Sequence, residues 1–184
     1  MDGQGAIAGR STESEHAASV NYQTGIDRTT VLIRGETAMR ELGSRLAEGL
    51  RIGDVLLLHG DLGSGKTTLT QGIAAGLSIR EAIMSPTFGI VAEYDGVASD
   101  GSSIRLHHLD LYRLDDPDDL ESIGFDQYAS PDDGITVIEW PERAIGWLPD
   151  RYLLVAISYA GLAERFVSIQ PVEGDDSARQ EVTR

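Results

Sequence analysis

Residues 60–68 read GDLGSGKTT and fit the pattern G-x-x-x-x-G-K-[ST], which is typical of loops that hold the phosphates of a nucleotide. The apolar run Val55–Leu58 precedes this loop and predicts a buried strand, while Leu69, Ile73 and Leu77 follow it at helical spacing. A strand, a glycine-rich loop and a helix in this order let backbone N–H groups and a helix N-terminus surround an anion. The sequence therefore predicts a nucleotide-binding loop. The residues expected to contact the nucleotide there are Asp61, Leu62, Gly63, Ser64, Gly65, Lys66, Thr67 and Thr68.

Lys66 is the only lysine in the chain, and the other residues of the Lys and Arg class are all arginines. A compositional bias has thus replaced lysine wherever arginine serves equally well. A phosphate-gripping position needs a compact ammonium on a flexible stem, which arginine does not provide. The retention of Lys66 strengthens the interpretation of the loop as a nucleotide site.

The length and composition indicate one globular domain, because 184 residues with 41% hydrophobic content can bury a sizeable core. Residues 1–27 are small and polar without sustained periodicity, and we predict a disordered extension there. We expect the domain to cover 28–171 and an acidic flexible tail to cover 172–184. No internal repeat or second domain is visible.

Strand and helix patterns alternate along the domain. Apolar and β-branched runs predict strands, and residues spaced at three and four predict helices. The predicted strands other than 55–58 are 29–33, 89–94, 104–112, 134–139, 152–158 and 165–170. The predicted helices besides the one after the loop are 36–50, 115–123 and 141–148. The polar stretch 95–102 predicts a hairpin turn, so the strands on either side of it should be antiparallel.

The bulk charge restricts the partners of the chain. Its formal net charge is -15, and such an acidic surface repels phosphate backbones, so we expect no tight nucleic-acid binding by the isolated chain. The charge suits docking onto a basic partner, or it merely keeps the protein soluble. There is no cysteine, no signal-peptide pattern and no apolar run of membrane-spanning length, so we expect a cytoplasmic protein without membrane contact.

Nucleotide hydrolysis requires Mg²⁺, which Thr67 and a carboxylate at the end of a neighbouring strand would hold. Glu139 ends a continuous apolar run, as expected for a buried strand that delivers an acid to the carboxyl edge of a sheet. Asp110 follows the less apolar run His107-His108-Leu109 and is the weaker candidate by pattern. The alternatives are a helix-capping role for Glu139 and a solvated edge position for Asp110.

Three other features stay open at the level of pattern. His107 and His108 lie on opposite faces of their strand, so at most one of them points toward the site, and neither is assigned. The segment 85–88, SPTF, is either a strand that begins with a proline or a switch in which Thr87 or Ser85 senses the γ-phosphate. Trp140 is most simply a packing or interface aromatic residue.

Four motifs in the same order resemble the bacterial TsaE (YjeE) family, the ATPase component of tRNA threonylcarbamoyladenosine biosynthesis. The motifs are GDLGSGKTT (60–68), SPTF (85–88), HLDLYR (108–113) and EWPE (139–142), and the similarity spans about 29–171. The resemblance implies an α/β fold, a single P-loop NTPase domain with a mixed, mostly parallel sheet flanked by helices. It also implies ATP and Mg²⁺ as cofactors and the proteins TsaB and TsaD as partners, with tRNA reached only indirectly through their complex.

The resemblance further implies roles for individual residues. Lys66 and Thr67 would hold phosphates and Mg²⁺, Asp110 would be an essential acid, and Glu139 would assist the metal and catalysis. Trp140 would matter to activity, and the switch role of Thr87 is favoured. ATP hydrolysis, slow in the isolated protein, would support repeated turnover of the TsaB–TsaD complex.

Two rival functions remain. A small-molecule P-loop kinase usually closes an arginine-bearing lid over the transferred phosphoryl group, and residues 115–133 contain neither arginine nor lysine. A nucleotide-gated binding module with negligible turnover is the second rival. A guanine-reading Asn-Lys-x-Asp motif cannot exist here, because Asn21 and Lys66 are the only residues of their types. An adenine-gated module stays possible.

Overall fold

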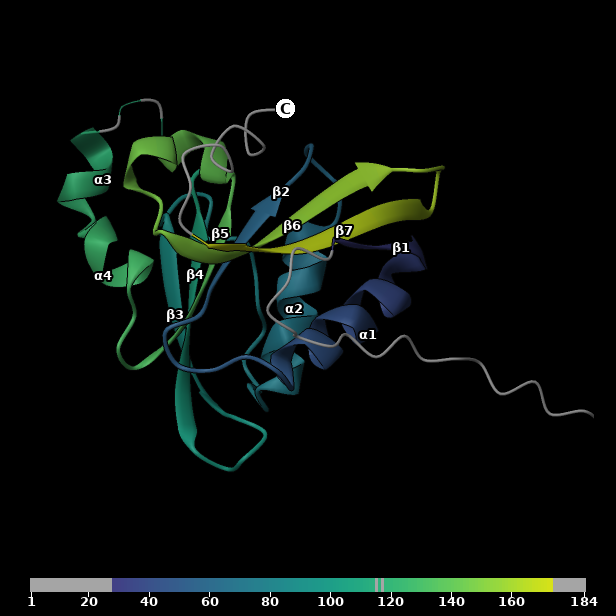
Figure 1. The fold of residues 1–184 in the computed structure, drawn as a ribbon, viewed down its shortest axis with the longest axis horizontal. Coiled ribbons are helices and arrows are strands. Elements are labelled where there is room, and N and C mark those ends of the chain that lie inside the picture. The colour runs from purple at the N-terminus through teal and green to yellow at the C-terminus, as the bar shows by residue number, and fades with distance from the viewer. Residues whose placement is uncertain (1–27, 115, 117, 174–184) are drawn as a thin grey trace, which may run out of the picture.

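The computed structural model describes residues 28–114, 116 and 118–173. These residues form one seven-stranded sheet with helices on both faces (Figure 1). The strands are β1 (Thr29–Arg34), β2 (Val55–His59), β3 (Val91–Val97), β4 (Ser103–Asp110), β5 (Gly134–Glu139), β6 (Arg151–Tyr159) and β7 (Glu164–Glu173). The helices are α1 (Gly35–Ala47), α2 (Lys66–Gly76), α3 (Asp118–Ser122), α4 (Phe125–Ala129) and the 3₁₀ helix η1 (Pro141–Trp147).

The sheet has the strand order β1-β7-β6-β2-β5-β4-β3. The four central strands β6, β2, β5 and β4 are parallel, and the pairs β1–β7, β7–β6 and β4–β3 are antiparallel. The predicted α/β class and mixed sheet are confirmed, with the parallel pairing confined to the centre. Because parallel strands end at one edge, the carboxyl ends of β2, β4 and β5 are brought together there.

Strand alternation divides the core into two layers. On β2, Leu56 and Leu58 face the apolar cluster beneath α1 and α2, whereas Val55 and Leu57 face the cluster beneath α3, α4 and η1. All four side chains are buried, as expected for a central strand covered on both faces. Figure 1 shows α1 and α2 side by side on one face of the sheet.

The two long helices cross at glycines. A Cβ on Gly43 of α1 would lie 2.3 Å from the carbonyl oxygen of Leu69, and one on Gly72 of α2 would lie 2.2 Å from that of Arg40. The backbones therefore approach more closely than any side chain permits. This close packing fixes α2, and with it the loop at the N-terminus of α2, on the sheet.

Several element boundaries differ from the prediction. The helix after the loop begins at Lys66, inside the stretch 60–68 that was predicted as the loop, because it continues directly from the glycine turn. Strand β3 extends through Asp95–Val97, which were predicted as turn, because these residues pair with β4 and Asp95 forms an ion pair with Arg105. Helix α4 was not predicted.

The sequence predicted an extension at the N-terminus and a flexible tail at the C-terminus. The predicted extension, 1–27, and residues 174–184 of the predicted tail lie outside the described residues. Val172 and Glu173, assigned to the tail by sequence, belong to β7, where Glu173 is paired with Arg151. Among the described helices, none combines the length and the apolar character that a membrane crossing requires.

Candidate functional site

The glycine loop lies between β2 and α2, at the carboxyl edge of the parallel strands. Gly60 and Gly65 have φ angles of 149° and 111°, which residues other than glycine rarely adopt. A Cβ on Gly60 would also lie 2.4 Å from the carbonyl oxygen of Ile157 on β6. The loop thus leads directly into α2, whose N-terminal N–H groups and dipole favour an anion.

Lys66 extends back across the loop. Its ammonium donates hydrogen bonds to the carbonyl oxygens of Gly60, at 2.6 Å, and Asp61, at 2.9 Å. It also lies 4.1 Å from the ring centroid of Trp140, within range of a cation–π interaction. Lys66 is only 5% exposed. Burial lowers the pKa of this ammonium, and four nearby carboxylates, Glu139 foremost, act in the opposite direction.

Thr67 and Glu139, the two predicted metal ligands, are in direct contact. The Thr67 hydroxyl donates to Glu139 Oε1 at 2.9 Å, with Oε2 at 3.3 Å. Glu139 ends β5, in register with Leu58 of β2, and is buried. The site therefore offers a hydroxyl and a carboxylate, the hard oxygen donors that Mg²⁺ prefers. An Mg²⁺ ion at this position would fit these two residues.

His108 is the histidine that belongs to the site. Its Nε2 lies 2.9 Å from Glu139 Oε1, and its ring is completely buried. His107, on the opposite face of β4, instead contacts carboxylates of Glu93 and Asp133. The alternation of β4 indicated that at most one histidine would face the site, and His108 is the one that shares a face with Asp110, two residues further along the strand.

Asp110 ends β4 and is held by the SPTF segment. Its Oδ2 accepts a hydrogen bond from the Thr87 hydroxyl at 2.7 Å and another from Ser85, and its Oδ1 accepts one from the Tyr112 N–H at 3.1 Å. Asp110 is buried and is the register partner of Glu139 on β5. The alternative of a solvated edge acid is therefore wrong, because β3 covers β4 on its outer side.

Trp140 follows Glu139 in a left-handed backbone conformation, with φ 61° and ψ 50°. This conformation is uncommon for a bulky residue and turns the chain sharply from β5 into η1. The indole contacts the Lys66 ammonium and lies 4.9 Å from the Tyr112 ring, measured between centroids. Trp140 thus packs within the site, next to Lys66.

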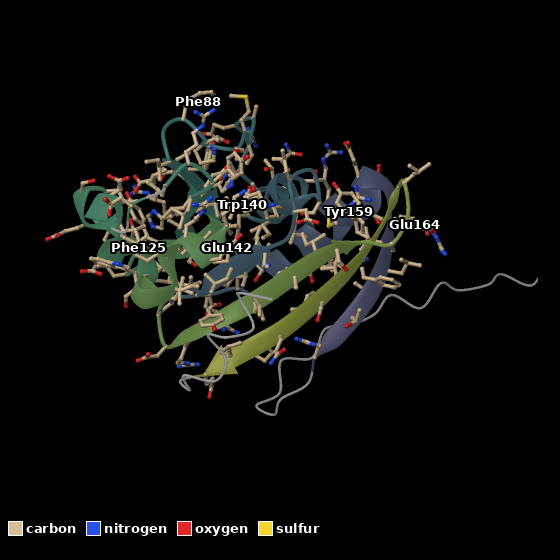
Figure 2. All side chains as sticks on the ribbon, turned by 90° about the horizontal axis from the view of Figure 1, so that it is seen from above. Phe88, Phe125, Trp140, Glu142, Tyr159 and Glu164 are labelled. Atoms are coloured by element: carbon tan, nitrogen blue, oxygen red, sulfur yellow. The ribbon has the colours of Figure 1, made fainter. Side chains whose placement is uncertain are left out.

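Figure 2 shows Phe88 at the periphery of the molecule and Trp140 nearer its centre. Phe88 is 87% exposed, and the Arg113 guanidinium lies 4.3 Å from the centroid of its ring. Leu62, in the loop itself, is also largely exposed. Apolar side chains therefore border a site whose interior is polar.

Sequence reasoning also missed two side chains that contact the loop. Tyr159 donates to the carbonyl oxygen of Leu62, and Arg165 donates to those of Gly63 and Ser64. Both residues come from the β6–β7 hairpin, about a hundred positions after the loop, and no local motif marks them.

A family model and individual relatives of this chain all point to the same family. The model of the family described as "Threonylcarbamoyl adenosine biosynthesis protein TsaE" matches residues 33–167. The tRNA threonylcarbamoyladenosine biosynthesis protein TsaE of a Nostoc species is 41% identical over 156 residues, which cover 83% of this chain and 92% of that protein. The protein of the same name from Streptomyces coelicolor is 43% identical over 123 residues, covering 66% and 80% respectively.

A solved structure agrees with these sequence matches. The crystal structure of Bacillus subtilis YdiB superposes with a TM-score of 0.67 at 29% sequence identity, covering 88% of this chain and 98% of that one. The family model matches well over half of the chain, and the Nostoc relative is similar over nearly its whole length. This chain belongs to the TsaE family of threonylcarbamoyl adenosine biosynthesis proteins.

Proposed function

We propose that this chain is an Mg²⁺-dependent ATPase that works with TsaB and TsaD in the threonylcarbamoyladenosine modification of tRNA, in the cytoplasm. The contact between Thr67 and Glu139 carries the proposed activity, because it joins the phosphate loop to a buried carboxylate on the neighbouring strand. Membership of the TsaE family supports the pathway. Hydrolysis, slow in the isolated chain, supports turnover of the complex.

Different residues of the site bind the phosphates and the metal ion. The loop amides and the Lys66 ammonium bind and orient the phosphates of ATP. Thr67 and Glu139 would hold Mg²⁺, which when bound neutralises charge on the phosphates. The indole of Trp140, packed against Lys66, limits the access of water to the ammonium.

The SPTF segment is proposed to respond to the nucleotide. Thr87 and Ser85 donate to Asp110, so this carboxylate fixes the segment at the end of β4. A γ-phosphate would compete with Asp110 for the Thr87 hydroxyl, and the exposed Phe88 would move with the segment. Asp110 thus couples the presence of a γ-phosphate to the position of Phe88 at the surface.

The charge of the chain supports indirect contact with tRNA. A net charge of -15 repels a phosphate backbone, so tRNA is reached only through the TsaB–TsaD complex. The same charge favours docking onto basic surfaces of the partners.

Measurement of ATP hydrolysis with and without the TsaB–TsaD pair tests this function. We expect Mg²⁺-dependent hydrolysis that the pair stimulates. Turnover indifferent to both partners would contradict the role in the complex. A phosphorylated metabolite in place of free phosphate would indicate the kinase alternative, and tight ATP binding without turnover would indicate the binding module.

Glu139→Ala should raise the Mg²⁺ concentration for half-maximal hydrolysis by about tenfold or more, because a carboxylate ligand is lost. The Mg²⁺-dependent part of the ATP affinity, measured by calorimetry, should fall in parallel. Glu121→Gln removes one negative charge from the exposed surface of α3 and serves as the control. An unchanged Mg²⁺ dependence in Glu139→Ala would remove this residue from the metal site.

A further inference from the structure

The outer side of the glycine loop is held by the β6–β7 hairpin. Three consecutive carbonyl oxygens of the loop, those of Leu62, Gly63 and Ser64, accept hydrogen bonds from two side chains. The Tyr159 hydroxyl donates to Leu62 at 2.9 Å, and Arg165 donates to Ser64 through Nε at 3.1 Å and to Gly63 through Nη2 at 3.3 Å. The loop is thus bound along its length from one hairpin.

Arg165 is itself fixed in place. Its Nη1 donates to the carbonyl oxygens of Glu164, at 2.9 Å, and Gly161, at 3.3 Å, within the hairpin turn. Its guanidinium lies 4.1 Å from the centroid of the Tyr159 ring. Tyr159 and Arg165 are register partners on β6 and β7, so the backbone also holds them together. Figure 2 shows Tyr159 and Glu164 at the same end of this hairpin.

Peptide geometry links these contacts to the phosphate side of the loop. In a planar trans peptide, the carbonyl and the following N–H point in opposite directions. Fixing the carbonyls of Leu62 and Ser64 toward the hairpin therefore directs the N–H groups of Gly63 and Gly65 away from it. Such N–H groups form the anion-binding surface of a phosphate loop.

We propose that Arg165 and Tyr159 are positioning residues that hold the loop in its phosphate-binding conformation. This inference rests on the proposed binding of nucleotide by the loop. Glycine-rich loops lose much backbone entropy when they are ordered, so bonds that order the loop beforehand strengthen the binding of its ligand. The two side chains act through the loop backbone.

The hairpin also offers a matched control. Arg34 of β1 donates to the Glu164 carboxylate at 2.9 Å and is largely exposed. Arg34→Gln therefore removes an arginine that contacts the same hairpin without contact to the loop. A role of Arg165 in hairpin stability alone predicts similar effects for the two substitutions, whereas a positioning role predicts different ones.

The first measurement is amide hydrogen exchange in nucleotide-free protein, followed at the Ser64 N–H, which donates to the carbonyl oxygen of Asp61 at 3.1 Å within the loop. Arg165→Gln should accelerate exchange in the loop by about tenfold or more, the factor expected when hydrogen bonds from a charged donor are lost. Tyr159→Phe should give a smaller acceleration, because it removes one neutral bond and keeps the ring beneath Arg165. Arg34→Gln should leave exchange in the loop unchanged. Equal exchange in Arg165→Gln and the unsubstituted protein would overturn the proposal without any reference to nucleotide.

The second measurement is the dissociation constant of ATP together with kcat. Arg165→Gln should weaken ATP binding by about tenfold while kcat at saturating ATP changes less, since Lys66, Thr67 and Glu139 are untouched. Arg165→Lys keeps the positive charge but lacks the planar fork that reaches two carbonyls, so it should not restore affinity. Full restoration by lysine would overturn positioning in favour of a simple charge effect. Absence of ATP binding by the unsubstituted protein would refute the proposed function, while hydrogen exchange would still decide whether the hairpin orders the loop.

Discussion

Lys66→Arg is expected to lower the rate of ATP hydrolysis by about 10²–10³-fold, nearly as far as Lys66→Ala, because the charged donor to the phosphates can no longer take its preorganised position. Arginine preserves the charge, so the reason is shape. The Lys66 ammonium reaches the carbonyl oxygens of Gly60 and Asp61 beneath the ring of Trp140, and the residue as a whole is only 5% exposed. A planar guanidinium is wider than the ammonium that takes this position.

The rate of phosphate release under saturating Mg²⁺ measures this effect, and circular dichroism checks that each variant is folded. Arg40→Lys provides the reciprocal exchange on the surface of α1, where Arg40 bonds to Glu36 and Gln71, and it should leave the rate within about twofold. If Lys66→Arg kept half of the original rate, the proposed fit of the ammonium would be wrong. The retention of a single lysine in an arginine-rich chain would then need another reason.

Gly72→Ala is expected to destabilise the domain by about 3 kcal/mol, at the upper end of the usual cost of overpacking. Helix propensity alone predicts the opposite sign, since alanine in a helix interior is favoured over glycine by about 1 kcal/mol. The added Cβ, however, would lie 2.2 Å from the carbonyl oxygen of Arg40. The obstacle is backbone of α1, which cannot rotate aside as a side chain can.

Urea denaturation gives the free energy of unfolding for this comparison. Gly146→Ala is the control, because a Cβ at Gly146 in η1 would meet no atom within 4 Å, and its effect should stay within about 1 kcal/mol. A stabilised Gly72→Ala would mean that the helices separate without cost. In that case the contact of α1 with α2 would not be what holds the loop helix on the sheet.

The fold was predictable where one local pattern determined the structure. Strand β5 has the predicted bounds, because a run of apolar and β-branched residues begins after Gly134 and ends at the acid Glu139. Helix α4 has only five residues, too few to show periodicity, and was missed. The glycine crossing of α1 and α2 was also invisible in the sequence, since Gly43 and Gly72 acquire their role only when two distant backbones meet.

In the candidate site too, residues marked by their neighbours in the sequence were predicted, whereas contacts between distant segments were not. The loop and Glu139 were recognised from their own neighbours along the chain. The contact of His108 with Glu139 depends on the pairing of β4 with β5, and the contacts of Arg165 depend on the return of β7 past the loop. Asp110 was ranked low because two histidines precede it, although the structure buries both of them beside carboxylates.

The distance along the chain between the loop and the hairpin has a consequence for synthesis of the protein. Arg165 is made 101 residues after Ser64, its hydrogen-bond partner. At typical rates of translation, the loop waits about 5–20 s for this contact. Strand β1 waits even longer, because its partner in the sheet is β7. The loop therefore gains its contacts with the hairpin late, although its sequence motif is translated early.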